Sequence, residues 1–222
     1  MSSAVIQLLV LAGVAVFLVV KLKNVLGTRE GFEKPPAPPP GRSDGAKSGR
    51  PDLEVIDGGP DRDITDHVDE DSTAAKALAA MKTAEPGFNV TEFLGGAKGA
   101  YEMILMAFEG GDIDSIRAFL SEDVAEAFDQ VIANRKKEGL TVDANFVGLR
   151  EVALQDARFT KKSSEGELVV KFVGELTSVV RDNAGDIVEG NPTEIKRQRD
   201  IWTFARKMGS DDPNWQLVAT GE

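Results

Sequence analysis

The sequence contains no cysteine and only one histidine, His67, among its 222 residues. Disulfides, thiolate nucleophiles and cysteine-based zinc sites are therefore excluded, and most histidine chemistry is excluded with them. The 26 lysine and arginine residues are outnumbered by 37 aspartate and glutamate residues, which argues against binding to nucleic acid. Nucleophile elbows, phosphate-binding loops and HExxH motifs are also missing. We therefore expect neither enzymatic activity nor a bound cofactor or metal.

An uncharged apolar run opens the chain. Residues 4–20 read AVIQLLVLAGVAVFLVV, with Gln7 as the only strongly polar side chain. A helix of this length spans about 25 Å, and the flanking Lys21 and Lys23 can extend to the interface of a hydrocarbon core of about 30 Å. A cleaved signal peptide is the alternative, but no charge precedes the run and no small-residue cleavage triplet follows it. The sequence predicts a transmembrane anchor at residues 1–26.

Cations lie only on the C-terminal side of this run, at Lys21, Lys23 and Arg29. The positive-inside rule then places the rest of the chain in the cytoplasm. Residues 34–41 (KPPAPPPG) favour stiff polyproline II, and acidic residues dominate from there to residue 71. Such a segment buries too little apolar surface to offset the entropy of ordering it. We expect a disordered, Pro-rich and acidic tether at residues 27–71.

Helical periodicity follows the tether. An alanine-rich stretch defines a short segment at residues 72–87, for which Asp71 or Ser72 can serve as the N-cap. Beyond it, apolar residues recur every three and four positions, and Gly110 and Gly139 supply stops. The predicted helices cover residues 71–83, 90–108, 113–120 (capped by Asp112) and 121–137.

After Gly139 the apolar period changes to two, which is typical of strands. Trp202 and Phe204 share one face of a strand, and a turn at residues 182–186 precedes that strand. Helices followed by an antiparallel meander indicate an α+β fold with the helices on one face of a four-stranded sheet. The predicted strands are 141–160, 167–181 (with Leu168, Val170, Phe172, Leu176 and Val180 on one face), 195–207 and 215–220.

Four stretches carry a resemblance to a known family: GAKGAYEMILMAFEGGD (96–112), FLSEDV (119–124), DxWTFxR (200–206) and PNWQLVAT (213–220). In this order and spacing, residues 88–222 resemble the Tim44-like domain family. The resemblance implies a cone-like fold of the nuclear transport factor two type, with helices over a curved sheet and an apolar cavity between them. It also implies an adaptor role at an inner membrane.

The family includes the scaffold of the mitochondrial presequence-translocase motor and bacterial membrane-anchored homologues. That scaffold has a long motor-binding region upstream of the domain, where this sequence has the acidic tether. The short anchor and tether resemble the bacterial homologues. The resemblance therefore implies a bacterial inner membrane, and the charge asymmetry around the apolar run places the C-terminal domain in the cytoplasm.

Two residue sets are candidates for binding. The first, a basic set, can contact an acidic partner or anionic lipid, although cations on a strand also serve simply to protect a solvated edge. The second can line a pocket for a lipid tail or hydrophobic peptide, although such residues also simply fill cores. The basic set is Lys196, Arg197, Arg199, Arg206 and Lys207, and the apolar set is Tyr101, Leu105, Phe128, Phe172, Trp202 and Phe204.

Asp200 is the one acid at the core-facing positions of the two long strands. Arg206 lies roughly 20 Å further along the same strand and is too far away to pair with it. We expect its partner to be a cation or a backbone N–H on a neighbouring element. The sequence as a whole favours a membrane-tethered adaptor that binds a protein partner, in protein translocation or membrane-protein biogenesis. The alternative is a domain that binds a lipid or small hydrophobic ligand.

Overall fold

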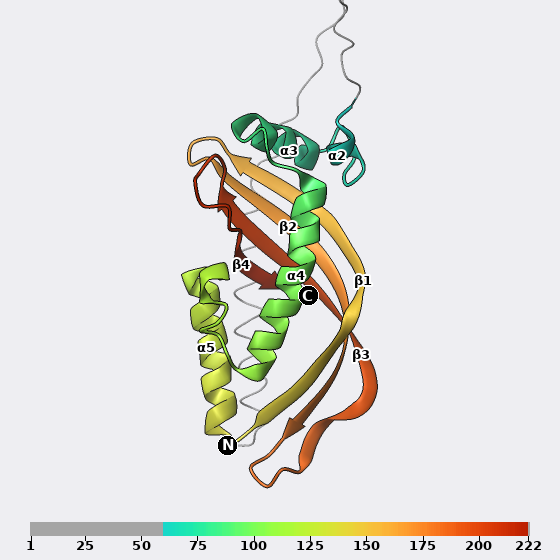
Figure 1. Cartoon of the computed structure of the whole chain (residues 1–222), viewed down its shortest axis with the longest axis vertical. Coiled ribbons are helices and arrows are strands. Elements are labelled where there is room, and N and C mark those ends of the chain that lie inside the picture. Colours follow the sequence, from blue (N-terminus) through green and yellow to red (C-terminus); the bar gives the residue numbers. More distant parts are fainter. Residues whose placement is uncertain (1–59, 222) are drawn as a thin grey trace, which may run out of the picture. The chain divides into compact units, whose positions relative to one another are not determined.

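The computed structural model describes residues 60–221 (Figure 1). The predicted anchor at residues 1–26 and most of the predicted tether lie outside the described residues. Within residues 60–221, no helix combines the length and the apolar character needed to cross a membrane.

Three α-helices correspond to predicted helical segments, and each begins at a polar cap. The Ser72 side chain accepts a hydrogen bond from the amide of Ala75, and the Ser121 side chain accepts one from the amide of Val124. Asn89 caps the longest helix in the same way. The helices are α3 (Thr73–Ala84), α4 (Val90–Gly110) and α5 (Glu122–Lys137).

The short helix predicted after Asp112 is not formed. The segment contains only a 3-10 turn, η1 (Arg117–Phe119), although Ile113, Ile116 and Leu120 are buried. Leu120 is extended and forms a β-bridge with Leu217, and the amide of Ser121 donates to the carbonyl of Leu217. Because this backbone pairs with the last strand, it cannot also complete a helical turn.

The sheet is an open antiparallel meander in the order β1-β2-β3-β4. Figure 1 shows the long strands curving, with α4 across one face and α5 beside it. The predicted first strand has the bounds found in the structure, and the third begins eight residues earlier than predicted, at Ile187 instead of residue 195. The strands are β1 (Thr141–Thr160), β2 (Glu165–Arg181), β3 (Ile187–Lys207) and β4 (Gln216–Gly221).

One face of the sheet forms the core with the helices, as predicted. The inward positions of β2 and β3 are buried against residues such as Leu78, Met81 and Ile104 of α3 and α4. The alternation predicted for β2 fails at its end, where Val179 is buried in place of Val180. The pairing of β2 with β3 is interrupted just before this point, between Leu176 and Ser178.

The predicted tether extended to residue 71, whereas the structure already includes residues 60–71 in the fold. Helix α2 (Arg62–Thr65) places Ile64 in the core. Asp63 accepts hydrogen bonds from the amides of Val90 and Thr91, at 2.8 and 3.0 Å, and so caps α4 from outside the helix. These contacts offset the entropy that was expected to keep this acidic segment disordered.

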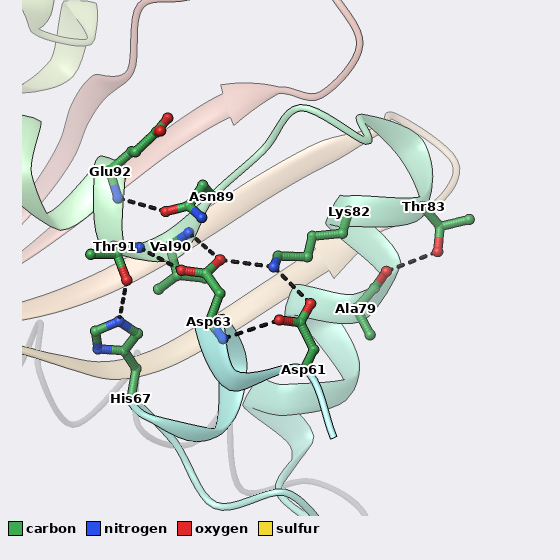
Figure 2. Close-up of polar contacts among 10 residues, drawn as sticks. All are labelled: Asp61, Asp63, His67, Ala79, Lys82, Thr83, Asn89, Val90, Thr91 and Glu92. Carbon is green, nitrogen blue, oxygen red and sulfur yellow. Dashed lines mark hydrogen bonds and ion pairs between the residues drawn. The ribbon is translucent and has the colours of Figure 1, made fainter. Parts of the chain in front are cut away.

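Lys82 of α3 completes this attachment (Figure 2). Its ammonium lies 2.7 Å from Asp61 and 2.8 Å from Asp63. Burial raises the pKa of Asp63, but hydrogen bonds from Lys82 and from the two amides of α4 outweigh burial and bring it from 3.8 to about 2. His67 contributes a contact of 3.0 Å between its Nε2 and Oγ1 of Thr91. We call Asp61, Asp63, His67 and Lys82 the N-terminal clasp.

Candidate functional site

Part of the predicted basic set forms an exposed cluster on β3. Lys196, Arg197 and Arg199 are exposed, and Arg197 and Arg199 point away from the helices because they alternate with the buried Asp200 and Trp202. We call these three cations the basic edge. Lys207 is also exposed, but it lies roughly 26 Å further along the strand than Arg199.

Arg206 does not belong to this surface. Its side chain is only 8% exposed, and Nη2 lies 2.6 Å from Oε1 of Glu85. The guanidinium also stacks over the Trp215 ring, 5.2 Å from its centroid. Burial raises the pKa of Glu85, but hydrogen bonds from Arg206 and the amide of Gly209 outweigh burial and leave it lowered. The inward position of Arg206 could have been read from the sequence, because Arg206 shares strand parity with the inward-facing Phe204.

A network of ion pairs surrounds the basic edge on the outer face of the sheet. Glu175 binds two cations at once, Arg150 at 2.8 Å and Arg197 at 3.2 Å. The hydrogen bonds from these arginines, Arg150 above all, lower the pKa of the Glu175 carboxyl. Within residues 60–221, Lys196 and Arg199 have no carboxylate within ion-pairing distance. The basic edge therefore carries charge that its own domain leaves uncompensated.

The predicted apolar set does not line one pocket. Its members Tyr101, Phe172, Trp202 and Phe204 form a packed aromatic cluster in the core, with ring centroids 4.5 Å apart for Tyr101 and Phe172 and 4.7 Å apart for Tyr101 and Trp202. The buried Leu105 belongs to the same core. The remaining member, Phe128, lies elsewhere, against Phe108 at 4.5 Å. The packing of these residues fits the interpretation that they fill the core, and not the interpretation that they line a binding pocket.

A different apolar pocket lies beside this cluster. It has a volume of about 320 Å³ and is bounded by α4, η1 and the segment leading into β4. Only Phe204 is shared with the predicted set. The position of Phe93 follows the helical period of α4, but the turn that brings Phe119 and Trp215 to the same place was not predictable from the sequence. The lining residues are Glu92, Phe93, Gly96, Ala97, Ala100, Phe119, Phe204, Pro213, Asn214 and Trp215.

Asp200 is buried, and its partner differs from the predicted cation or backbone N–H. The Tyr101 hydroxyl donates to Oδ2 at 2.5 Å, and the Gln198 amide donates to Oδ1 at 3.0 Å. Burial and the bond to Asp200 raise the pKa of Tyr101 well above its usual range, so the phenol remains a donor. Within the part of the chain that the structure describes, no group of three or more histidine, aspartate or glutamate residues is placed to hold a metal ion.

The family model of the Tim44-like domain matches residues 74–222. The chain belongs to the Tim44-like domain family. The match begins inside α3, earlier than the resemblance at residues 88–222 had indicated, and it includes every strand of the sheet. The N-terminal clasp lies mainly before it, since only Lys82 falls within the matched residues.

Two curated relatives are mitochondrial import inner membrane translocase subunits. TIM44-1 of Arabidopsis thaliana is 21% identical over 163 residues, which cover 70% of this chain and 34% of that protein. TIM44 of Homo sapiens is 24% identical over 148 residues, which cover 65% of this chain and 32% of that protein. The chain therefore spans about a third of the length of the curated relatives that it matches.

One solved structure, the intermembrane space region of the chloroplast protein ARC6, aligns with a TM-score of 0.35. The identity is 13%, and the alignment covers 52% of this chain and 82% of that one. A TM-score of this size does not bear on function.

Proposed function

We propose that this Tim44-like domain is an adaptor, tethered to an inner membrane, that binds a protein partner in protein translocation or membrane-protein biogenesis. The relatives support this role, since their names describe subunits of an inner-membrane import translocase. The apolar run at residues 4–20 supports the tether. The proposal includes no enzymatic step, and it places the chain in a bacterial inner membrane with the domain in the cytoplasm.

The observation that carries the proposal is the basic edge. Lys196, Arg197 and Arg199 are exposed on a protein whose formal net charge is −11. A cation cluster of this kind attracts an oppositely charged partner and speeds their encounter. An anionic lipid surface is the alternative target of the same charges.

Crosslinking in membranes tests the adaptor role. A photoreactive amino acid replaces Ile195, which is 55% exposed next to the basic edge, or Val147, which is 49% exposed on β1 and serves as the control. We expect a defined protein adduct in mass spectrometry from position 195 and none from position 147. Equal adducts at both positions, or adducts with lipid alone, would contradict the adaptor role.

Alkaline carbonate extraction tests the tether. We expect the chain to stay in the membrane pellet, and Leu11→Arg to weaken its retention because arginine at a helix centre costs about 3 kcal/mol. Leu26→Arg, at the end of the predicted anchor, is the matched control, because arginine costs less near the interface. Release of the unsubstituted chain by carbonate would contradict the tether.

A second candidate function follows from the pocket between α4 and Trp215. Its aromatic lining and volume of about 320 Å³ suit a small hydrophobic ligand or part of a lipid tail. Gly96 lines the pocket and a Cβ there meets no atom within 4 Å, so the side chain of Gly96→Phe begins in open space and is the variant chosen to fill the pocket. We expect any lipid that copurifies with the chain to be lost in this variant. Equal lipid content in both proteins would exclude the pocket as its site.

A further inference from the structure

Strand β3 has an edge that β4 leaves uncovered. The pairing with β4 runs only from Ile201 to Ala205, and Gly221 lies opposite Ile201. From Lys196 to Asp200, β3 pairs with β2 on one side. On the other side, no strand of the described chain lies against these five residues. We call residues 196–200 the open edge.

A bulge bounds the open edge at its other end. Lys196 pairs with Leu176, but the next pairing joins Asn191 to Ser178, so residues 192–195 leave the ladder. The Asn191 side chain holds this bulge by accepting from the amide and hydroxyl of Thr193. The open edge therefore spans about 16 Å, in line with β4, which is room for one short strand.

The unpaired N–H and C=O groups of such an edge form a template for another strand. The neighbouring side chains set the charge of that strand. On the outer face, Arg150, Lys171, Arg197 and Arg199 surround only two acids, Glu151 and Glu175, which leaves an excess of two positive charges.

This excess does not extend along β1, the strand at the other border of the sheet. With Arg150 and Glu151 included, β1 carries the acids Asp143, Glu151 and Asp156 against the cations Arg150 and Arg158. A second copy of this chain would bring one basic edge against another, and like charges opposite each other repel. A bilayer can satisfy the cations, but it has no strand to pair with the backbone. The charges and the backbone together fit an extended acidic peptide.

We propose that the open edge binds an extended acidic segment of a partner protein as an added β-strand, with acidic side chains at alternate positions facing Arg197 and Arg199. This inference rests on the proposed adaptor function and specifies the partner's chemistry. Backbone hydrogen bonds hold the segment, and the two arginines select acids spaced two residues apart. Glu194 lies in the bulge and Glu189 lies beyond it. Their negative charges disfavour acidic residues of the bound segment that extend past the end of the open edge.

Binding of a synthetic peptide tests the charge requirement. The probe is a peptide of about seven alternating glutamate and threonine residues, titrated by fluorescence anisotropy into the full chain in detergent at low salt. We expect Arg199→Glu and Arg197→Glu each to weaken binding about tenfold or more, because each reverses a contacting charge. Lys207→Glu, a charge reversal at an exposed site away from the open edge, should change the affinity less than about twofold.

Two N-methylated peptides test the backbone requirement. One carries N-methyl groups at the odd positions and the other at the even positions, so only one of them blocks the amides that pair with β3. We expect one peptide to lose binding and the other to keep it. Equal binding of both would mean that charge alone is recognised, and the strand-addition proposal would be overturned.

Failure of this inference can be distinguished from failure of the adaptor role. If the peptide does not bind but position 195 still crosslinks to a protein, strand addition is wrong and the adaptor role stands. Flotation of a fragment covering residues 60–222, which lacks the proposed anchor, with vesicles containing an anionic phospholipid gives the remaining outcomes. If Arg199→Glu abolishes flotation and the peptide does not compete with the vesicles, the surface binds lipid and the proposal is overturned. If the peptide competes with the vesicles and reduces flotation, the result supports the proposal.

Discussion

The hydroxyl of Tyr101 lies 2.5 Å from the carboxylate of Asp200 and joins α4 to β3 across 99 positions of the sequence. The contact lies inside the aromatic cluster formed with Phe172 and Trp202. Gly174 leaves space for it, because a Cβ at that position would approach the Tyr101 oxygen to 2.8 Å. A buried carboxylate is costly unless it is hydrogen-bonded, so this pair fixes where α4 rests on the sheet.

Removing the Tyr101 hydroxyl should destabilise the domain. We expect Tyr101→Phe to lower the free energy of unfolding by about 1–3 kcal/mol, because Asp200 loses a donor and keeps only Gln198. Urea unfolding of a fragment covering residues 60–222, followed by tryptophan fluorescence, measures this change. A double-mutant cycle with Asp200→Asn should show coupling above about 0.5 kcal/mol. Additive effects would mean that the contact contributes little.

Trp202→Ala should have a larger effect, because it leaves a cavity inside the aromatic cluster. We expect a loss of about 3–5 kcal/mol in the free energy of unfolding. Val147→Ala on β1 is the control, since that side chain is 49% exposed and its loss should stay within about 0.5 kcal/mol. Thermal unfolding followed by circular dichroism compares the two variants. A loss as small for Trp202→Ala as for the control would contradict the packing described.

The ion pair of Arg206 with Glu85 should also be separable from the exposed cations. Glu85→Gln leaves the buried guanidinium without its charged partner and should cost about 2 kcal/mol. This is less than the 3–5 kcal/mol typical of fully buried pairs, because Glu85 is a quarter exposed. Lys207→Ala, next to Arg206 but exposed, should be neutral within about 0.5 kcal/mol. Equal denaturation midpoints for the two variants would rule out a structural role for the pair.

The N-terminal clasp predicts that the stability of a soluble fragment depends on the residue at which the fragment begins. A fragment starting at residue 60 keeps Asp63 and Ile64, whereas one starting at residue 72 loses both. We expect the shorter fragment to be less stable by about 2–4 kcal/mol, since it loses a buried isoleucine and the outer cap of α4. Denaturant unfolding of both fragments measures the difference. Equal stability would show that residues 60–71 contribute nothing to the fold.

The pH dependence of stability should reveal Asp63. Its pKa is about 2 in the folded chain, below the ordinary 3.8, so its charged form is stabilised by folding. The contribution, about 2 kcal/mol, is present above pH 4 and should disappear as the pH falls towards 2. Asp63→Asn should therefore be less stable at pH 7 and less sensitive to acid between pH 4 and 2. Parallel acid-unfolding curves for the two proteins would refute this assignment.

Much of the fold follows from local patterns in the sequence. The α+β class, the bounds of β1 and the starts of α3 and α5 were predictable, because periodicity and capping depend on residues within a few positions of each other. The inward position of Arg206 was also predictable, since strand alternation with Phe204 requires it. Arg206 was nevertheless predicted to lie on the surface, because that prediction followed its charge and not the strand alternation.

Other features were decided only by the tertiary structure. Composition alone indicates disorder for the acidic residues 60–71, but Lys82 and the amides that begin α4 give Asp63 its partners. The partner of Asp200 is a phenol 99 positions away, and the open edge is bounded by the bulge at residues 192–195 and, among the described residues, by the last pair of β3 with β4 at Ile201. The sequence by itself determined most of the helices and strands and their apolar faces, because those properties are local. The predicted helix at residues 113–120 is an exception, because its last residue pairs with β4 instead. Register, ion pairing and free edges arise only when distant segments pack together, because the energy of each contact depends on both partners being in place.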